Sequence, residues 1–145
     1  MNFLDALNTT SSGLSAQRLR MNLVSGNLAN INTTRTPEGG PYQRKEAVFA
    51  AQPVGRSFRD MLNSQIPGEM SEVKVVRIID DPRPAISKYE PHHPDADENG
   101  YVAMPNINLM EEMVNMMSAS QSYEANVTAA DATKKMALKA LEIGS

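Results

Sequence analysis

Apolar residues near the start of the chain recur every seven positions. One line of this repeat comprises Leu7, Leu14, Met21 and Leu28, and a second line of the same period comprises Phe3, Val24 and Ile31. A seven-residue apolar repeat is typical of a helix that packs along another helix. The pattern predicts a long helix that ends in an Asn-rich stretch around Asn27, where side-chain amides compete for backbone hydrogen bonds. Gly13 and Gly26 each cost about 1 kcal/mol relative to Ala, so we expect this helix to need a partner.

The last forty residues repeat the pattern. One line comprises Leu109, Met116, Tyr123, Ala130 and Ala137, and the line four residues later comprises Met113, Val127 and Leu141. Pro105 stops any preceding element, and Asn108 with Glu111 three positions later resembles a capping box. This segment predicts a second long helix, so we expect the two ends of the chain to pair as a coiled coil.

The middle of the chain differs in kind, because all nine prolines lie between Pro37 and Pro105. Short runs of β-branched and aromatic residues at 42–49 and 72–79 predict strands, and residues 58–66 indicate one or two turns of helix. Residues 80–99 have the composition of a turn-rich loop that closes at Asn99 and Gly100. We therefore expect a mainly α fold with two terminal helical segments, 1–35 and 106–145, around a small β-rich middle, 36–105.

Composition narrows the function classes. A chain of 145 residues has the length of one domain, and a net charge of -3 without a Lys/Arg cluster argues against nucleic acid as a partner. Without Cys the chain can form no disulfide and no thiolate site. The longest apolar run, residues 47–51, is too short to span a bilayer, so we expect no lipid insertion. Residues 1–5 include an acid and no apolar block follows, so we expect no cleaved signal peptide.

Few residues offer chemistry. The segment 92–98 contains two His, two Asp and a Glu, but adjacent His side chains point apart in extended backbone, so a solvated turn is favoured over a metal site. No phosphate loop or hydrolase motif occurs, and we expect neither a cofactor nor an enzyme. Four Met within eight residues indicate either a helix-packing core or an adaptable binding groove; these are Met110, Met113, Met116 and Met117.

Several motifs carry a family resemblance. Residues 12–17, Ser-Gly-Leu-Ser-Ala-Gln, precede 27–34, Asn-Leu-Ala-Asn-Ile-Asn-Thr-Thr. Together they resemble the N-terminal signature of bacterial flagellar rod and hook proteins, whose motif falls on Asn27, Ala29, Asn30 and Thr33. Further segments at 36–42, 93–97, 100–106, 108–113 and 122–126 resemble the pattern of the proximal-rod members of that family.

The resemblance implies a structural subunit of the flagellar basal-body proximal rod. Such a subunit would polymerise with itself and other rod proteins through its terminal helices, transmit torque and line the export channel. It would pass through the flagellar type III export apparatus and reside in the periplasmic rod. The residues alone leave open a soluble helical-hairpin binding module or export adaptor, which would form a small closed oligomer rather than a helical stack.

Overall fold

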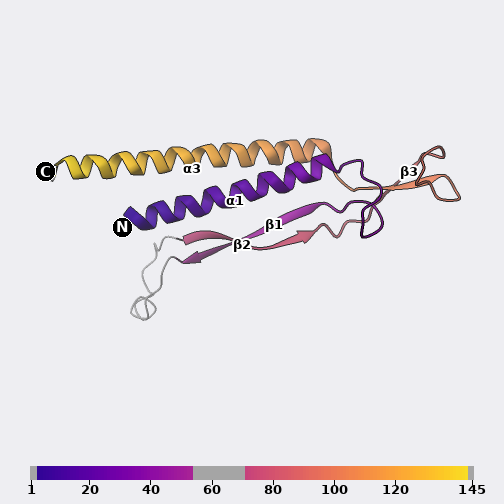
Figure 1. The fold of residues 1–145 in the computed structure, drawn as a ribbon, viewed down its shortest axis with the longest axis horizontal. Coiled ribbons are helices and arrows are strands. Elements are labelled where there is room, and N and C mark those ends of the chain that lie inside the picture. The colour runs from indigo at the N-terminus through magenta and orange to yellow at the C-terminus, as the bar shows by residue number, and fades with distance from the viewer. Residues whose placement is uncertain (1–2, 54–70, 144–145) are drawn as a thin grey trace.

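A computed structural model describes residues 3–53 and 71–143 and shows an elongated molecule in layers (Figure 1). Helix α1 spans Phe3–Ala29 and helix α3 spans Leu109–Ile143. The strands are β1 (Lys45–Pro53), β2 (Ser71–Asp80), β3 (Ile86–Tyr89) and β4 (Tyr101–Met104). Helices α1 and α3 lie side by side and antiparallel, and the β1–β2 ribbon runs along α1 (Figure 1). The sequence therefore predicted the two long helices and the small β-rich middle correctly.

Helix α1 is the middle layer and is buried on two sides. Its most buried residues, Ala16, Val24 and Asn27, include only one large apolar side chain. Val73 of β2 donates its backbone N–H to Ser12 Oγ over 3.1 Å, which fixes the ribbon to one side of this helix. The apolar core is thin, so the helix pair has few large anchors.

The face of α3 that lies against α1 is set by side-chain contacts. Asn27 bonds to Glu112, Arg20 Nη2 donates to Asn115 Oδ1 over 3.4 Å, and a Cβ on Gly13 would lie 3.0 Å from Asn126 Nδ2. Buried and half-buried positions follow these contacts at alternating spacings of four and three; they are Glu112, Met116, Ala119, Tyr123, Asn126, Ala130, Thr133 and Ala137.

The first predicted line of α3 lies on this face from Met116 onward, whereas Leu109 and the second line are exposed. Met116 and Tyr123 are half-buried, whereas Met113, Val127 and Leu141 are exposed. The other line of residues on the observed contact face contains Glu112 and small or polar residues instead of the predicted apolar ones. For its second line, apolar periodicity therefore selected the exposed side of the helix next to the contact face.

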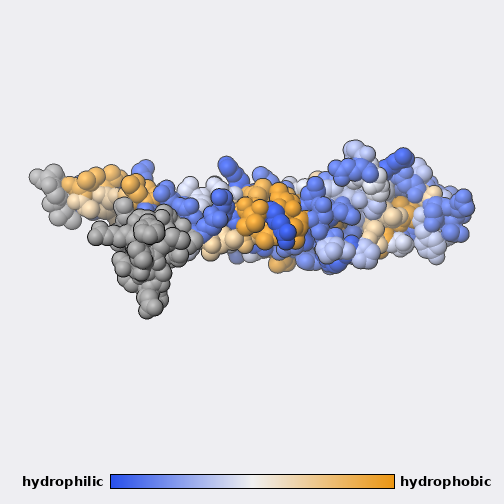
Figure 2. All heavy atoms as spheres, turned by 90° about the horizontal axis from the view of Figure 1, so that it is seen from below, coloured by the Kyte–Doolittle hydropathy of each residue, from blue (hydrophilic) through white to orange (hydrophobic). Residues whose placement is uncertain are grey.

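The β1–β2 ribbon is antiparallel, with Lys45 opposite Asp80 and Pro53 opposite Ser71. Its register shifts between Val48 and Phe49, which leaves an extra β2 residue and bends the ribbon. Viewed from the side away from the helices, the middle of the ribbon shows an apolar patch (Figure 2). The exposed large apolar side chains of β2 are Val73, Val76 and Ile78.

The expected turn-rich loop over 80–99 is partly wrong, because it contains β3, which pairs with β4. Tyr89 stands opposite Tyr101, and their rings meet edge to face with centroids 5.3 Å apart. β3 forms because it pairs with β4, which begins fifteen residues after β3 begins. The local composition of β3 does not indicate a strand. The expected short helix at 58–66 lies outside the described residues. Within the described residues, no helix is long and apolar enough to cross a membrane.

Candidate functional site: a polar clasp and an exposed helix face

The family-motif residues end α1 and begin the following turn. Asn30 Nδ2 donates to the carbonyl of Gly26 over 2.9 Å, one turn back in the helix. Thr33 Oγ1 donates to Asn30 Oδ1 over 3.1 Å, and the Thr33 carbonyl accepts from the N–H of Tyr42 at 3.0 Å. These bonds satisfy groups that a helix end leaves unpaired. They also return the chain toward α1, whereas Ala29 is exposed beside them.

Asn27 is fully buried and uses its whole amide. Its Nδ2 donates to Glu112 Oε2 and to the carbonyl of Lys45, both over 3.0 Å. Its Oδ1 accepts from the N–H of Lys45 at 2.9 Å and from the hydroxyl of Tyr42 at 3.1 Å. An amide has two donor hydrogens and two acceptor lone pairs, so no hydrogen-bonding capacity remains. This one side chain connects α1, β1 and the first turn of α3.

Arg44 and Glu112 form a buried ion pair beside Asn27. Arg44 Nε donates to Glu112 Oε1 over 2.7 Å, and the two side chains are 9% and 1% exposed. Arg44 Nη1 also lies 3.1 Å from Glu46 Oε2 and 3.7 Å from Asp81 Oδ2. Breaking such a pair leaves an uncompensated buried charge, so its members depend on each other. We call Asn27, Tyr42, Arg44, Asp81 and Glu112 the polar clasp.

The charge states of the clasp follow from its surroundings. Burial alone would lower the pKa of Arg44, but the hydrogen bond and the charge of Glu112 raise it, so the guanidinium stays protonated. Burial, with the negative charge of Asp80, raises the pKa of Tyr42, so its hydroxyl remains a donor at neutral pH. The hydrogen bond from Arg83 lowers the pKa of Asp81. Arg44 and Asp81 therefore keep their charges near neutral pH.

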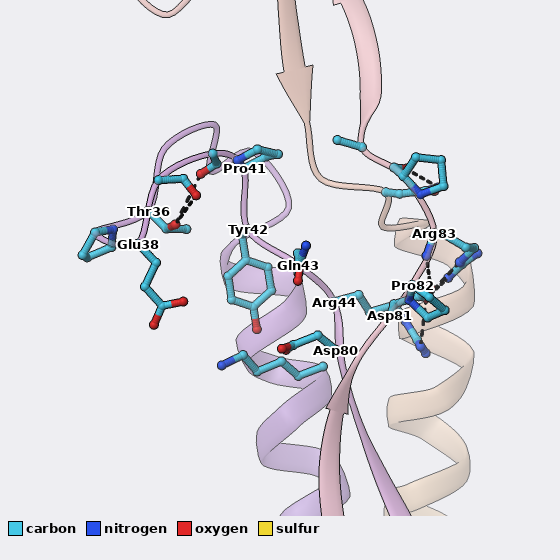
Figure 3. Close-up of a pocket in the computed structure, with 17 residues that line it drawn as sticks. Thr36, Glu38, Pro41, Tyr42, Gln43, Arg44, Asp80, Asp81, Pro82 and Arg83 are labelled. Carbon is cyan, nitrogen blue, oxygen red and sulfur yellow. Dashed lines mark hydrogen bonds and ion pairs between the residues drawn. The ribbon is translucent and has the colours of Figure 1, made fainter.

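An open cavity of about 760 Å³ lies beside the clasp, between residues 36–45 and 80–85. Figure 3 shows Glu38, Tyr42 and Asp80 along one side, with the bonds between Asp81 and Arg83 on the other. Acidic and basic groups both line it, so it favours no single charge of ligand. In the described parts of the chain, no three His, Asp or Glu residues are placed to hold a metal ion.

The His-rich turn stabilises its own backbone. His93 Nδ1 accepts the N–H of Asp95 at 3.1 Å, and Thr34 Oγ1 donates to Asp95 Oδ2 over 2.8 Å. Asp97 Oδ1 accepts the N–H groups of Asn99 and Tyr101 at 2.9 and 2.8 Å. These contacts are typical of a capped surface turn, and they hold the β3–β4 hairpin closed.

The second notable feature is a set of exposed apolar side chains at the start of α3. Five large residues are between 48% and 68% exposed, and we call them the α3 patch; they are Leu109, Met110, Met113, Val114 and Met117. Of the other predicted packing residues, Val127 and Leu141 are also exposed, whereas the N-terminal line is half-buried; its members are Leu7, Leu14, Met21 and Leu28. Soluble monomers rarely expose contiguous apolar patches without an interaction to explain them.

Comparison with known proteins finds relatives that match nearly the whole chain. The chain is 46% identical to the flagellar basal-body rod protein FlgC of Bacillus subtilis, covering 99% of each chain. It is 43% identical to the FlgC of Borreliella burgdorferi, covering 99% of this chain and 98% of that one. The chain belongs to the FlgC family of flagellar basal-body rod proteins. It is therefore a structural subunit of the flagellar basal-body rod and not an enzyme.

Two family models match the ends of this FlgC-family chain. The model of the flagella basal body rod protein matches residues 7–35, and that of the flagellar basal body rod FlgEFG protein C-terminal matches 98–143. The matched segments contain most of α1, with Asn27, and β4 with α3 and Glu112. The hydrogen bond from Asn27 to Glu112 therefore joins the two segments that are matched by rod-family models, whereas Arg44 comes from the segment between them.

Sequence reasoning selected Asn27 of this FlgC-family chain but missed the partners that surround it. Glu111 and Glu112 are adjacent acids in the first turn of α3, where either would suit the helix dipole. Only Glu112 points toward α1, and the sequence gives no sign of this choice. Arg44 precedes an apolar strand, which is a weak signal for a buried charge that must be paired.

Proposed function

We propose that this FlgC-family chain is a proximal-rod subunit that packs against its neighbours through the terminal helices and transmits torque. The α3 patch carries the proposal, because its five large apolar side chains are between 48% and 68% exposed in the described chain. Covering each would contribute on the order of 1 kcal/mol, and the gain is repeated in every subunit. In this proposal α1 and α3 form an antiparallel coiled coil inside each subunit.

The polar clasp would make the subunit stiff enough for that task. Torque that reaches α3 through its neighbours must pass to α1 and the ribbon without the elements sliding. Asn27 and Glu112 fix the register of the two helices by a hydrogen bond of 3.0 Å, and Arg44 adds β1 through its 2.7 Å bond to Glu112. Polar contacts of this kind specify one register, where small apolar residues alone would permit slippage.

We also propose that the chain crosses the flagellar export apparatus as a loose polypeptide and orders on meeting its neighbours in the periplasmic part of the rod. The thin core supports this proposal, because few buried side chains offset the entropy of ordering the helices. The absence of Cys in the sequence prevents cross-linking on emergence. Contacts between subunits would then supply the missing stabilisation.

The test is to place charge on the α3 patch without touching the helix pair. Met110 and Met117 lie seven residues apart on one exposed face, so Met110→Asp with Met117→Asp should leave the isolated subunit unchanged in helix content. Each buried charge would cost several kcal/mol in an assembled rod, and rods should not form. Changing the same two positions to Leu keeps the face apolar and is the matched control.

Basal bodies would be counted by electron microscopy at matched protein levels, with swimming in soft agar as the second readout. We expect the Asp variant to lack rods and the Leu variant to resemble the wild type. Normal rods in the Asp variant would refute the assignment of the α3 patch to subunit packing.

A further inference from the structure

The two ends of this elongated molecule expose different apolar groups. At one end α3 extends past the start of α1 (Figure 1). The contacts of Asn27 with Glu112 and of Gly13 with Asn126 advance fourteen residues along each helix, so the same register places Phe3 beside residue 136. Residues 137–143 therefore lie beyond Phe3; with Met136 they form what we call the α3 overhang.

The α3 overhang carries exposed apolar side chains. Leu141 is 72% exposed. Met136 and Leu138 are also exposed on this end. Apolar side chains are thus exposed where α3 has no α1 beside it.

The opposite end is the β3–β4 hairpin, which projects past the other ends of both helices (Figure 1). Ile86, Tyr89 and Tyr101 are exposed on it, and the two Tyr rings make one aromatic surface. The two ends of the molecule also carry opposite net charge. Residues 86–104 carry one Lys and four acids, a balance of -3, whereas residues 134–143 carry three Lys and one Glu, a balance of +2.

We infer that the α3 overhang of one copy docks on the β3–β4 hairpin of a second copy, with Leu138 and Leu141 against Tyr89 and Tyr101. The inference rests on the proposed function as a rod subunit. Opposite charge at the two ends orients the contact, and apolar side chains are covered on both sides. Because the two surfaces differ, the contact is heterologous: copies follow one another in one direction and do not close as a two-fold dimer.

A contact of this size is weak between two free molecules and holds only beside the other contacts of an assembly. It is therefore tested in purified basal bodies. The chain has no Cys, so Leu138→Cys with Tyr89→Cys introduces the only two thiols. These sites lie at opposite ends of one molecule (Figure 1), and a short bismaleimide linker can join them only between copies. Leu138→Cys with Arg77→Cys, on the middle of β2, is the matched control.

We expect covalent species of two or more copies from the Leu138 and Tyr89 pair and only single copies from the control pair. Equal cross-linking in both pairs, a link to another protein, or single copies alone in basal bodies that contain rods would overturn the inference. The last result would leave the rod function intact, because rods had formed.

If the paired Cys variant builds no rods, a benzophenone amino acid at Leu138 in the otherwise native chain replaces it. Its cross-linked peptide, identified by mass spectrometry from purified basal bodies, should come from residues 86–104 of this protein. A peptide from any other segment, or no cross-link, contradicts the docking surface.

Discussion

Replacing Glu112 by Gln tests whether the polar clasp holds the helices together. Gln keeps the size of the side chain but removes its charge. Its single oxygen can accept from Arg44 or from Asn27, and its amide then faces the other donor. At least one charge-assisted hydrogen bond is lost, worth about 1.5–3 kcal/mol. We expect the loss of stability to lie near the low end of the cost of breaking a buried ion pair. The reason is that Glu46 and Asp81 still lie near Arg44.

A urea titration of purified basal bodies would measure this loss, with release of the chain followed by immunoblot. Small proteins lose about 1–3 kcal/mol of stability per molar urea, so the release midpoint should fall by roughly 1 M. Glu111→Gln is the matched control, since it makes the same chemical change at the adjacent, exposed position. An unchanged midpoint for Glu112→Gln, or an equal fall for Glu111→Gln, would refute the reasoning.

Three further predictions concern neighbouring contacts; the first is read from rod assembly and the other two from the same titration. Asn27→Ala leaves the buried groups around it unpaired and should abolish rod assembly. Ala at the exposed Asn22 is the control and should have little effect. Equal assembly by both variants would contradict the role of the clasp. Gly26→Ala should raise the urea midpoint, because it adds about 0.5–1 kcal/mol of helix stability. Gly13→Ala should not, because its methyl group would lie 3.0 Å from the Asn126 side chain of α3. A gain of the same size at both positions would argue against this helix contact. The hydrogen bond from Arg83 lowers the pKa of Asp81, so the stabilisation that ionised Asp81 provides is complete above about pH 4 and is lost below. Acid should therefore lower the midpoint less in Asp81→Asn than in the wild type.

Membership of the FlgC family decides between the functions that the residues alone left open. A small helical adaptor would cover its apolar helix faces in a closed oligomer. The exposed α3 patch at one end, and different apolar groups at the two extremities, suit packing against several non-identical surfaces. The Met residues in the α3 patch provide the flexible side chains that such contacts favour.

The sequence by itself determined the features that depend on neighbours along the chain. Seven-residue periodicity predicted both helices, and Asn108 caps α3 by accepting the N–H of Met110 at 2.9 Å. The Asn-rich motif predicted the end of α1, because side-chain amides satisfy the local backbone there. The tertiary structure decided what depends on residues far apart. It selected Glu112 over Glu111 and left Met113 exposed, because burial depends on where α1 lies and not on local hydropathy.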